Sequence, residues 1–169
     1  MKLMMRRRQL LFTLAGAAGA LSGCGFALRR PPQLSAQRIL LNGFAPLSPM
    51  AEELRRQLRA SPGVELVDNM AQAQLVLDSL LDQRLRTAAA STATGLVSDL
   101  SLRARFRFRV RNPAGTVLIN DTELAVNRDM AYSETSALAK EQEADQLFEA
   151  MQADIARQVL RRLAALPPQ

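Results

Sequence analysis

The sequence contains no histidine and no tryptophan, and Cys24 is its only cysteine. A single cysteine excludes a disulfide bond within the chain. The lack of histidine excludes a Cys/His zinc site and any Ser-His or Cys-His catalytic pair. Sites built from carboxylates alone remain possible, but no pair of acidic residues indicates one. We therefore expect a protein that is not an enzyme and that has no metal or other cofactor.

A hydrophobic run long enough to span a membrane is also missing from the N-terminal region. Basic residues up to Arg8 precede an apolar run at residues 10–21, which is shorter than the ~20 residues of a membrane-spanning helix. A basic segment, a short apolar run and small residues before Cys24 are typical of a cleaved secretory signal, here residues 1–23. The run Arg7-Arg8-Gln9-Leu10-Leu11 also resembles a twin-arginine export signal, so the export route stays open.

The tetrapeptide Leu21-Ser22-Gly23-Cys24 resembles the bacterial lipoprotein box. The resemblance implies that Cys24 carries covalent lipid, whereas the alternative is an ordinary signal peptide with a chance cysteine. Two or more acyl chains anchor a protein stably. Gly25 stands where an aspartate would resemble the inner-membrane retention signal, so we expect a lipid anchor on the periplasmic side of the outer membrane.

Charge and composition indicate one balanced domain behind this leader. The chain has 22 basic and 16 acidic residues, but four of the basic ones precede residue 9, which leaves a net charge of +2. An exported, lipid-anchored chain with this balance disfavours a nucleic-acid partner. Prolines near residue 31 predict an extended tether over residues 24–37. Residues 38–165 suffice for one domain with its own core, followed by a tail at 166–169.

Residues 100–111 alternate strictly between apolar and polar side chains, which predicts a strand with one buried face. The other face carries a row of arginines about 6.5–7 Å apart, which repel one another unless something compensates their charge. One interpretation is a solvated face that is partly paired with acids of adjacent strands. The other is a surface for an anionic partner, since guanidinium groups bind phosphate and carboxylate well. We call this row the arginine ladder: Arg103, Arg105, Arg107, Arg109 and Arg111.

Turn and cap signals divide the domain into strands and helices. Ser48 followed by Pro49 predicts a helix start, because serine is a good N-cap and proline suits the first helical position. The strand, helix, strand order around this helix favours a right-handed crossover. We predict strands at residues 39–41, 64–68, 74–88, 100–111 and 116–128, with a flexible hairpin tip at 89–95. We predict helices at residues 49–60 and from 137 to about 163, with buried stripes of Met50, Leu54 and Leu58, and of Ala144, Phe148, Met151, Ile155, Val159 and Leu163.

The parity of apolar residues also predicts how the strands pair. In the strand at 74–88 we expect Leu75, Leu77, Leu81 and Leu85 on the core face, and Asp78, Asp82, Arg84 and Arg86 on the outer face. A plausible register then sets Asp82 opposite Arg105 and Asp78 opposite Arg109. A change of parity after Asn120 predicts a β-bulge before Glu123. It sets Val117 opposite Val110, Ile119 opposite Phe108, Leu124 opposite Ala104 and Glu123 opposite Arg105, and leaves Arg103, Arg107 and Arg111 without an evident acidic partner.

Lys140 is the only lysine after the leader. It lies near the start of the long helix, where the helix dipole disfavours a cation. One interpretation is a solvated lysine beside Glu134, Glu141 and Glu143, which contributes little. The other is that Lys140 reaches an anionic ligand.

The order of these parts resembles the LptE family of lipopolysaccharide-assembly lipoproteins. The resemblance rests on residues 24–29 after the lipoprotein box, on the helix with Gly63-Val64-Glu65-Leu66 behind it, on Ala137-Leu138-Ala139-Lys140-Glu141, and on Leu160-Arg161-Arg162-Leu163. It implies a two-layer α+β fold with a mixed, mostly antiparallel sheet of four to five strands and two helices on one face. It also implies a plug in the lumen of the outer-membrane barrel LptD that binds lipopolysaccharide, with Lys140 as a candidate contact. The arginine ladder could bind lipopolysaccharide or face the barrel wall.

A second function shares the leader and a small α+β domain. An outer-membrane lipoprotein could instead activate a cell-wall synthase or pilot a secretion pore. Copurification with a barrel and lipopolysaccharide, or with a peptidoglycan enzyme or secretin, distinguishes the two.

Overall fold

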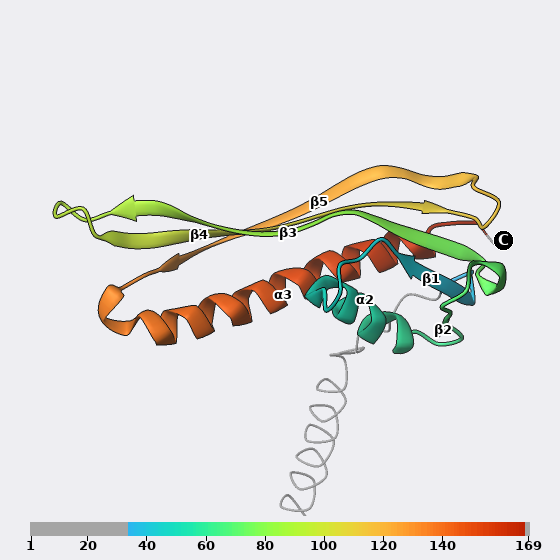
Figure 1. Ribbon diagram of the computed structural model, residues 1–169, viewed down its shortest axis with the longest axis horizontal. Coiled ribbons are helices and arrows are strands. Elements are labelled where there is room, and N and C mark those ends of the chain that lie inside the picture. The colour runs from blue at the N-terminus through green and yellow to red at the C-terminus, as the bar shows by residue number, and fades with distance from the viewer. Residues whose placement is uncertain (1–33, 168–169) are drawn as a thin grey trace, which may run out of the picture. The chain divides into compact units, whose positions relative to one another are not determined.

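The computed structural model describes residues 34–167 (Figure 1). The predicted signal peptide, Cys24 and the tether up to residue 33 lie outside the described residues. The elements in chain order are β1 (Arg38–Asn42), α2 (Pro49–Arg59), β2 (Glu65–Leu66), the 3-10 turn η2 (Met70–Gln72), β3 (Leu75–Ser91), β4 (Val97–Arg111), β5 (Val117–Ala131), η3 (Glu134–Ser136) and α3 (Ala137–Ala164).

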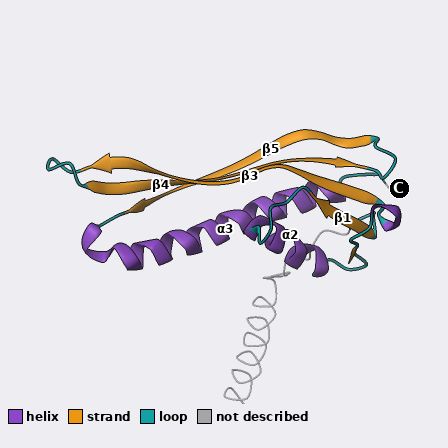
Figure 2. Ribbon diagram, in the orientation of Figure 1, coloured by secondary structure: helices purple, strands orange, loops and turns teal. Residues whose placement is uncertain are grey.

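The strands form one mixed sheet in the order β2-β1-β3-β4-β5. β1 runs parallel to β2 and β3, whereas the β3–β4 and β4–β5 pairs are antiparallel. Both helices lie on the same face of this sheet, with α3 along its length and α2 beside α3 (Figures 1 and 2). The predicted two-layer α+β fold is therefore confirmed.

The core lies between the sheet and the helices, where the predicted apolar residues meet. On β4 the buried side chains alternate as expected: Leu102, Ala104, Phe106, Phe108 and Val110. All six residues of the predicted α3 stripe and all three of the α2 stripe are buried. The rings of Phe44, Phe106 and Phe108 stack in sequence, with centroids 5.8 and 5.5 Å apart. Within the predicted tether, Ala36 is also part of this core.

The start of α2 follows the predicted capping chemistry. Ser48 is the N-cap, and its Oγ accepts a hydrogen bond from the Ala51 amide at 3.0 Å. Pro49 occupies the first turn, where its missing N–H is not needed. Ser48 Oγ also donates to Asp82 Oδ2 of β3 at 2.6 Å, so that the helix start is tied to the sheet.

Each strand differs in length from its prediction, and β2 and β3 differ in ways that matter for the fold. β2 has only two paired residues, because the chain leaves the sheet there and Val67 packs with Ala73 and Val76 in a small separate cluster. β3 continues to Ser91, since its pairing with β4 extends to Val97. The hairpin tip is therefore shorter than predicted, and it projects past the start of α3 in Figure 1.

The predicted parity of β3 is wrong beyond Ser79. Ser79 pairs with Phe108 and Leu81 pairs with Arg107, so β3 has one extra residue at this point. A bulge of one residue reverses which face every later side chain occupies. Leu81 and Leu85 consequently lie on the face away from the helices, and Asp82, Arg84 and Arg86 lie on the helix face. Asp82 faces Phe106 instead of Arg105, whereas the predicted pairing of Asp78 with Arg109 is confirmed.

β5 carries the predicted bulge, between Ile119 and Thr122, and a second one at Leu118 that the pattern did not indicate. In addition, the first paired residue of β5, Val117, lies opposite Arg111, one residue away from the predicted partner Val110. Because of these two differences the predicted pairs are wrong, and the observed ones are Val117 with Arg111, Ile119 with Val110, Leu124 with Phe106 and Glu123 with Arg107.

Among residues 34–167, no helix is both long and apolar enough to cross a membrane.

Candidate functional site: the open face of the sheet

The arginine ladder lies on the face of the sheet that neither helix covers. Its side chains alternate along β4 with the core residues, and α2 and α3 pack on the opposite face. Arg103 and Arg107 are exposed, and the other three are half-buried. Because the charges would repel one another without partners, the partners of each arginine decide what this face can bind.

Arg111 has an acidic partner, Asp78, that the sequence analysis did not predict. Its Nε lies 2.7 Å from Asp78 Oδ2 and its Nη2 lies 3.3 Å from Oδ1, a bidentate pair. Asn42 Nδ2 also donates to Asp78 Oδ1, at 2.8 Å. The expectation that Arg111 lacks an acidic partner is therefore wrong, because it pairs diagonally across the β3–β4 ladder.

The pKa of Asp78 follows from this arrangement. Burial of the carboxyl raises its pKa, but hydrogen bonds from Arg111 and Asn42 and the charges of Arg111 and Arg109 lower it by more. The net result is a pKa below the usual value for aspartate. Arg109 contributes only as a charge, since its closest oxygens, on Asp78 and Asp121, are 3.9 and 3.8 Å away.

Arg105 pairs with Glu123, as predicted, although the strand register places these two residues diagonally. Arg105 Nε lies 2.8 Å from Glu123 Oε1, and its Nη2 lies 3.1 Å from Oε2. The hydrogen bonds from Arg105 lower the pKa of Glu123, and the charges of Arg107 and Arg103 act in the same direction. One carboxylate therefore lies within the field of three arginines.

The side chains of Arg103 and Arg107 make no hydrogen bond or ion pair with any residue in the described part of the chain, in agreement with the prediction for these two. They lie four positions apart on one strand, about 13 Å at ~3.3 Å per residue. The open face thus presents two separate, exposed guanidinium groups on either side of a neutralised Arg105–Glu123 pair.

Apolar side chains beside these arginines were missed by the sequence interpretation. Leu85 lies opposite Arg103, and Leu81 lies opposite Arg107. Both leucines are half-buried on the open face, because of the β3 bulge described above. The only sequence signal for that bulge is that the alternation of apolar and polar residues breaks at Ser79-Leu80. In a short apolar run such a break does not show which side chains face the core.

Lys140 does not lie near the arginine ladder. It belongs to α3, in the layer on the other face, and its Nζ lies 2.8 Å from Glu143 Oε2. Of the three acids predicted beside it, Glu143 is the one that pairs with it. The structure therefore brings the five arginines together and leaves Lys140 at a separate position.

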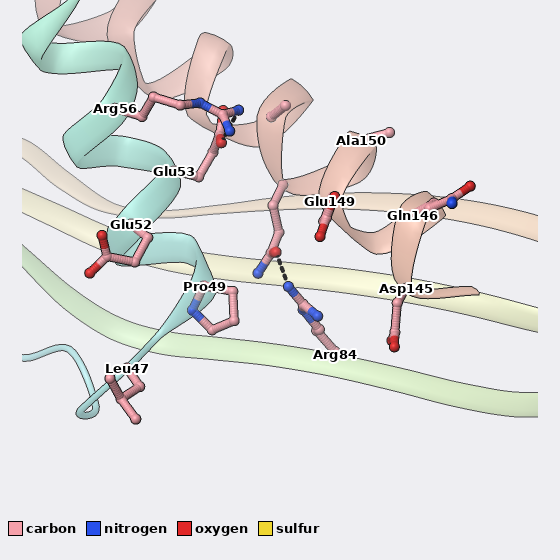
Figure 3. A pocket seen from close by; sticks show the side chains of 12 residues that line it. Leu47, Pro49, Glu52, Glu53, Arg56, Arg84, Asp145, Gln146, Glu149 and Ala150 are labelled. Atoms are coloured by element: carbon pink, nitrogen blue, oxygen red, sulfur yellow. Dashed lines mark hydrogen bonds and ion pairs between the residues drawn. The ribbon is translucent and has the colours of Figure 1, made fainter. Parts of the chain in front are cut away.

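A groove of about 920 Å³ lies between α2, α3 and β3 (Figure 3). Arg84 reaches into it from β3, donates to Gln152, and stacks 5.3 Å from the centre of the Phe148 ring. Arg86 stacks on the same ring at 5.5 Å and pairs with Glu141 and with Asp145. These contacts fasten β3 to α3, so the two arginines have a structural role here. In residues 34–167, no group of acidic or cysteine side chains is arranged to hold a metal ion.

Comparisons with known proteins agree with this architecture. A solved structure of lipoprotein B from Nitrosomonas europaea has a TM-score of 0.71 at 22% identity, over 83% of this chain and 91% of that one. Rare lipoprotein B from Shewanella oneidensis has a TM-score of 0.65 at 23% identity, over 76% and 95%. The chain is also similar to the LPS-assembly lipoprotein LptE of Yersinia enterocolitica, with 29% identity over 94% of this chain and 77% of the relative.

The profile of one protein family, LptE, described as lipopolysaccharide-assembly, matches residues 36–163. This match includes every strand, all of α2, and α3 up to Leu163. The chain belongs to the LptE family and is a non-enzymatic lipopolysaccharide-assembly lipoprotein.

Proposed function

We propose that this protein plugs the lumen of an LptD-type outer-membrane barrel, helps that barrel to assemble, and binds lipopolysaccharide during its insertion into the outer leaflet. The observation that carries the proposal is the open face of the sheet, where Arg103 and Arg107 are exposed and unpaired. Membership in the LptE family selects lipopolysaccharide assembly over the activation of a cell-wall synthase or the piloting of a secretion pore.

The two faces of the sheet suit the inside of a barrel. A barrel lumen in the outer membrane is polar, so a plug needs a polar surface instead of a second apolar layer. Here the helices already cover the apolar face, and the open face carries the arginines with their acidic partners. The uncovered surface can therefore contact polar walls, and acidic groups of a wall could pair with Arg103 and Arg107.

The chemistry of the open face also fits an anionic amphiphile. Lipopolysaccharide combines phosphate groups with acyl chains. Arg103 and Arg107 offer guanidinium groups for phosphate, and Leu85 and Leu81 lie directly beside them on β3. A ligand that contacts both side-chain types gains electrostatic and apolar contributions from one surface.

Lys140 is a second candidate contact in this proposal. Its present partner is Glu143, so binding of a phosphate requires the lysine to exchange one anion for another. The lipid on Cys24 would hold the domain at the periplasmic side of the outer membrane. At ~3.3 Å per residue, the segment between Cys24 and residue 34 spans at most about 33 Å, which keeps the domain near that membrane.

The test is affinity purification of the full-length, acylated protein from its outer membrane. The wild type is compared with Arg103→Gln/Arg107→Gln, and each eluate is probed for a large barrel and for lipopolysaccharide. The matched control is Arg161→Gln/Arg162→Gln, which removes the same charge from exposed positions of α3.

We expect the wild type and the control to recover both partners. Loss of lipopolysaccharide alone in the ladder variant assigns Arg103 and Arg107 to the lipid, and loss of the barrel assigns them to its wall. A wild type that recovers no barrel contradicts the plug, and equal losses in the ladder variant and the control contradict a specific role for the open face.

A further inference from the structure

β5 is an edge strand with a long, regular outer edge. It is the last strand in the sheet order, and residues 122–131 pair with β4 in one unbroken register from Phe108 to Asp99. Both bulges of β5 lie before this segment. At ~3.3 Å per residue the segment is about 30 Å long. The other edge of the sheet, β2, offers only two residues.

One hydrogen bond identifies which backbone groups of this segment point outward. The Tyr132 amide donates to Ser98 O at 2.8 Å, in line with the β4–β5 register. In an antiparallel pair, alternate residues direct both backbone groups to the neighbouring strand. Even-numbered residues of the segment therefore bond β4. The backbone N–H and C=O groups of Glu123, Ala125, Asn127 and Asp129 point away from the sheet.

The usual devices that block an edge are scarce here. The segment contains no proline, glycine or lysine, and within residues 34–167 no element outside β4 forms a hydrogen bond with its backbone. The four residues whose backbone points outward are all exposed. Such an edge is a template for strand addition by another chain.

The side chains of the edge select the partner. Glu123 and Asp129 lie on the open face. Glu123 already pairs with Arg105, whereas Asp129 has no ion pair with any described residue. A second copy paired antiparallel about Val126 would place Glu123 opposite the Asp129 of the partner, which is repulsive. On the helix face, Val126 is a half-buried apolar residue at the same edge, beside Leu124 in the core. The edge therefore disfavours its own copy and favours a strand that places a basic residue beside Asp129 on one face and an apolar residue beside Val126 on the other.

We propose that the outer edge of β5 binds, by β-strand addition, an extended segment of another protein in which basic and apolar residues alternate. The backbone of Glu123, Ala125, Asn127 and Asp129 supplies the hydrogen bonds. A basic side chain of the segment lies beside Asp129, and an apolar side chain on its other face lies beside Val126. This site is distinct from the arginine ladder and does not depend on lipopolysaccharide binding.

The experiment measures amide hydrogen exchange, residue by residue, on the full-length protein in detergent. The probes are a ten-residue peptide that alternates arginine and valine and an acidic counterpart that alternates glutamate and valine. Without peptide, we expect fast exchange at the four outward amides and slow exchange at Leu124, Val126 and Arg128. The arginine peptide slows the four outward amides, and the acidic peptide does not. Equal protection by both peptides, no protection, or protection only elsewhere overturns the proposal.

Substitutions at two positions test the charge and the backbone separately. Asp129→Lys weakens binding of the arginine peptide by about tenfold, with Asp129→Asn in between, as expected for loss of a charge-assisted contact. Ala125→Pro removes one outward donor and abolishes protection, whereas Ala125→Thr keeps the donor and binds as the wild type does. Slow exchange at Val126 and Arg128 reports that each variant is folded. A concentration-dependent dimer without peptide, measured by sedimentation, also overturns the proposal.

Discussion

Arg111 and Asp78 form a bidentate ion pair across β3 and β4, with Arg111 Nε 2.7 Å from Asp78 Oδ2. Asp78 is only 6% exposed, and Asn42 of β1 donates to the same carboxylate. One aspartate therefore connects three adjacent strands, β1, β3 and β4, at the centre of the strand order, where the parallel and antiparallel pairs meet.

Replacing this aspartate should destabilise the fold. We expect Asp78→Asn to lower the free energy of unfolding by about 2 kcal/mol, because it leaves a charged, half-buried Arg111 without its partner. Urea denaturation measures the change. The matched control is Glu123→Gln, which breaks the more exposed pair with Arg105 and should have a smaller effect. An equal effect of the two substitutions would contradict a special role for Asp78.

The same carboxylate predicts a dependence of stability on pH. The pKa of Asp78 is lower in the folded protein than in the unfolded chain, where an aspartate titrates near about 3.9. Its contribution is therefore complete above that value and is lost as the pH falls through the folded pKa. Denaturation at a series of pH values between 7 and 2 should show a steeper acid loss for the wild type than for Asp78→Asn. Parallel profiles would contradict this assignment.

Gly43 permits a close contact between the end of β1 and the β3 bulge. Its φ is +77°, and a Cβ at this position would lie 2.8 Å from the Ser79 carbonyl oxygen. Gly63 has nearly the same φ, +76°, but open space around it. We expect Gly63→Ala to cost about 1 kcal/mol for the left-handed conformation, and Gly43→Ala to cost clearly more. Thermal or urea denaturation compares the two, and equal losses would show that the contact with Ser79 does not matter.

The bulge in β3 predicts unequal effects for two leucines that the sequence placed on one face. Leu77 is fully buried in the core, so Leu77→Ala should cost about 2–5 kcal/mol. Leu85 is half-buried on the open face, so Leu85→Ala should cost at most about 1.5 kcal/mol. Similar losses in urea denaturation would mean that Leu85 faces the core as first predicted.

The sequence alone predicted the elements whose signals are local. The alternation of residues 100–111 identifies β4 and its buried face, because only a strand has a side-chain period of two. Likewise, Ser48 and Pro49 identify the start of α2, and the stripe from Ala144 to Leu163 identifies the buried face of α3. The sequence also predicted that Arg105 pairs with Glu123, although the predicted register was wrong and the ion pair forms diagonally.

Tertiary structure alone decided the pairing beyond each bulge. One extra residue near Leu80 moves Leu81 and Leu85 to the open face and Arg84 to the core side, although their local sequence is equally compatible with the reverse. The free energy of each alternative register depends on contacts between different elements of the fold. In the observed register, Arg84 stacks on the Phe148 ring of α3, and Arg111 pairs diagonally with Asp78. Those contacts join residues far apart in the chain. The sequence by itself thus determined which side chains form the arginine ladder, and the fold determined that Arg103 and Arg107 are its two free members.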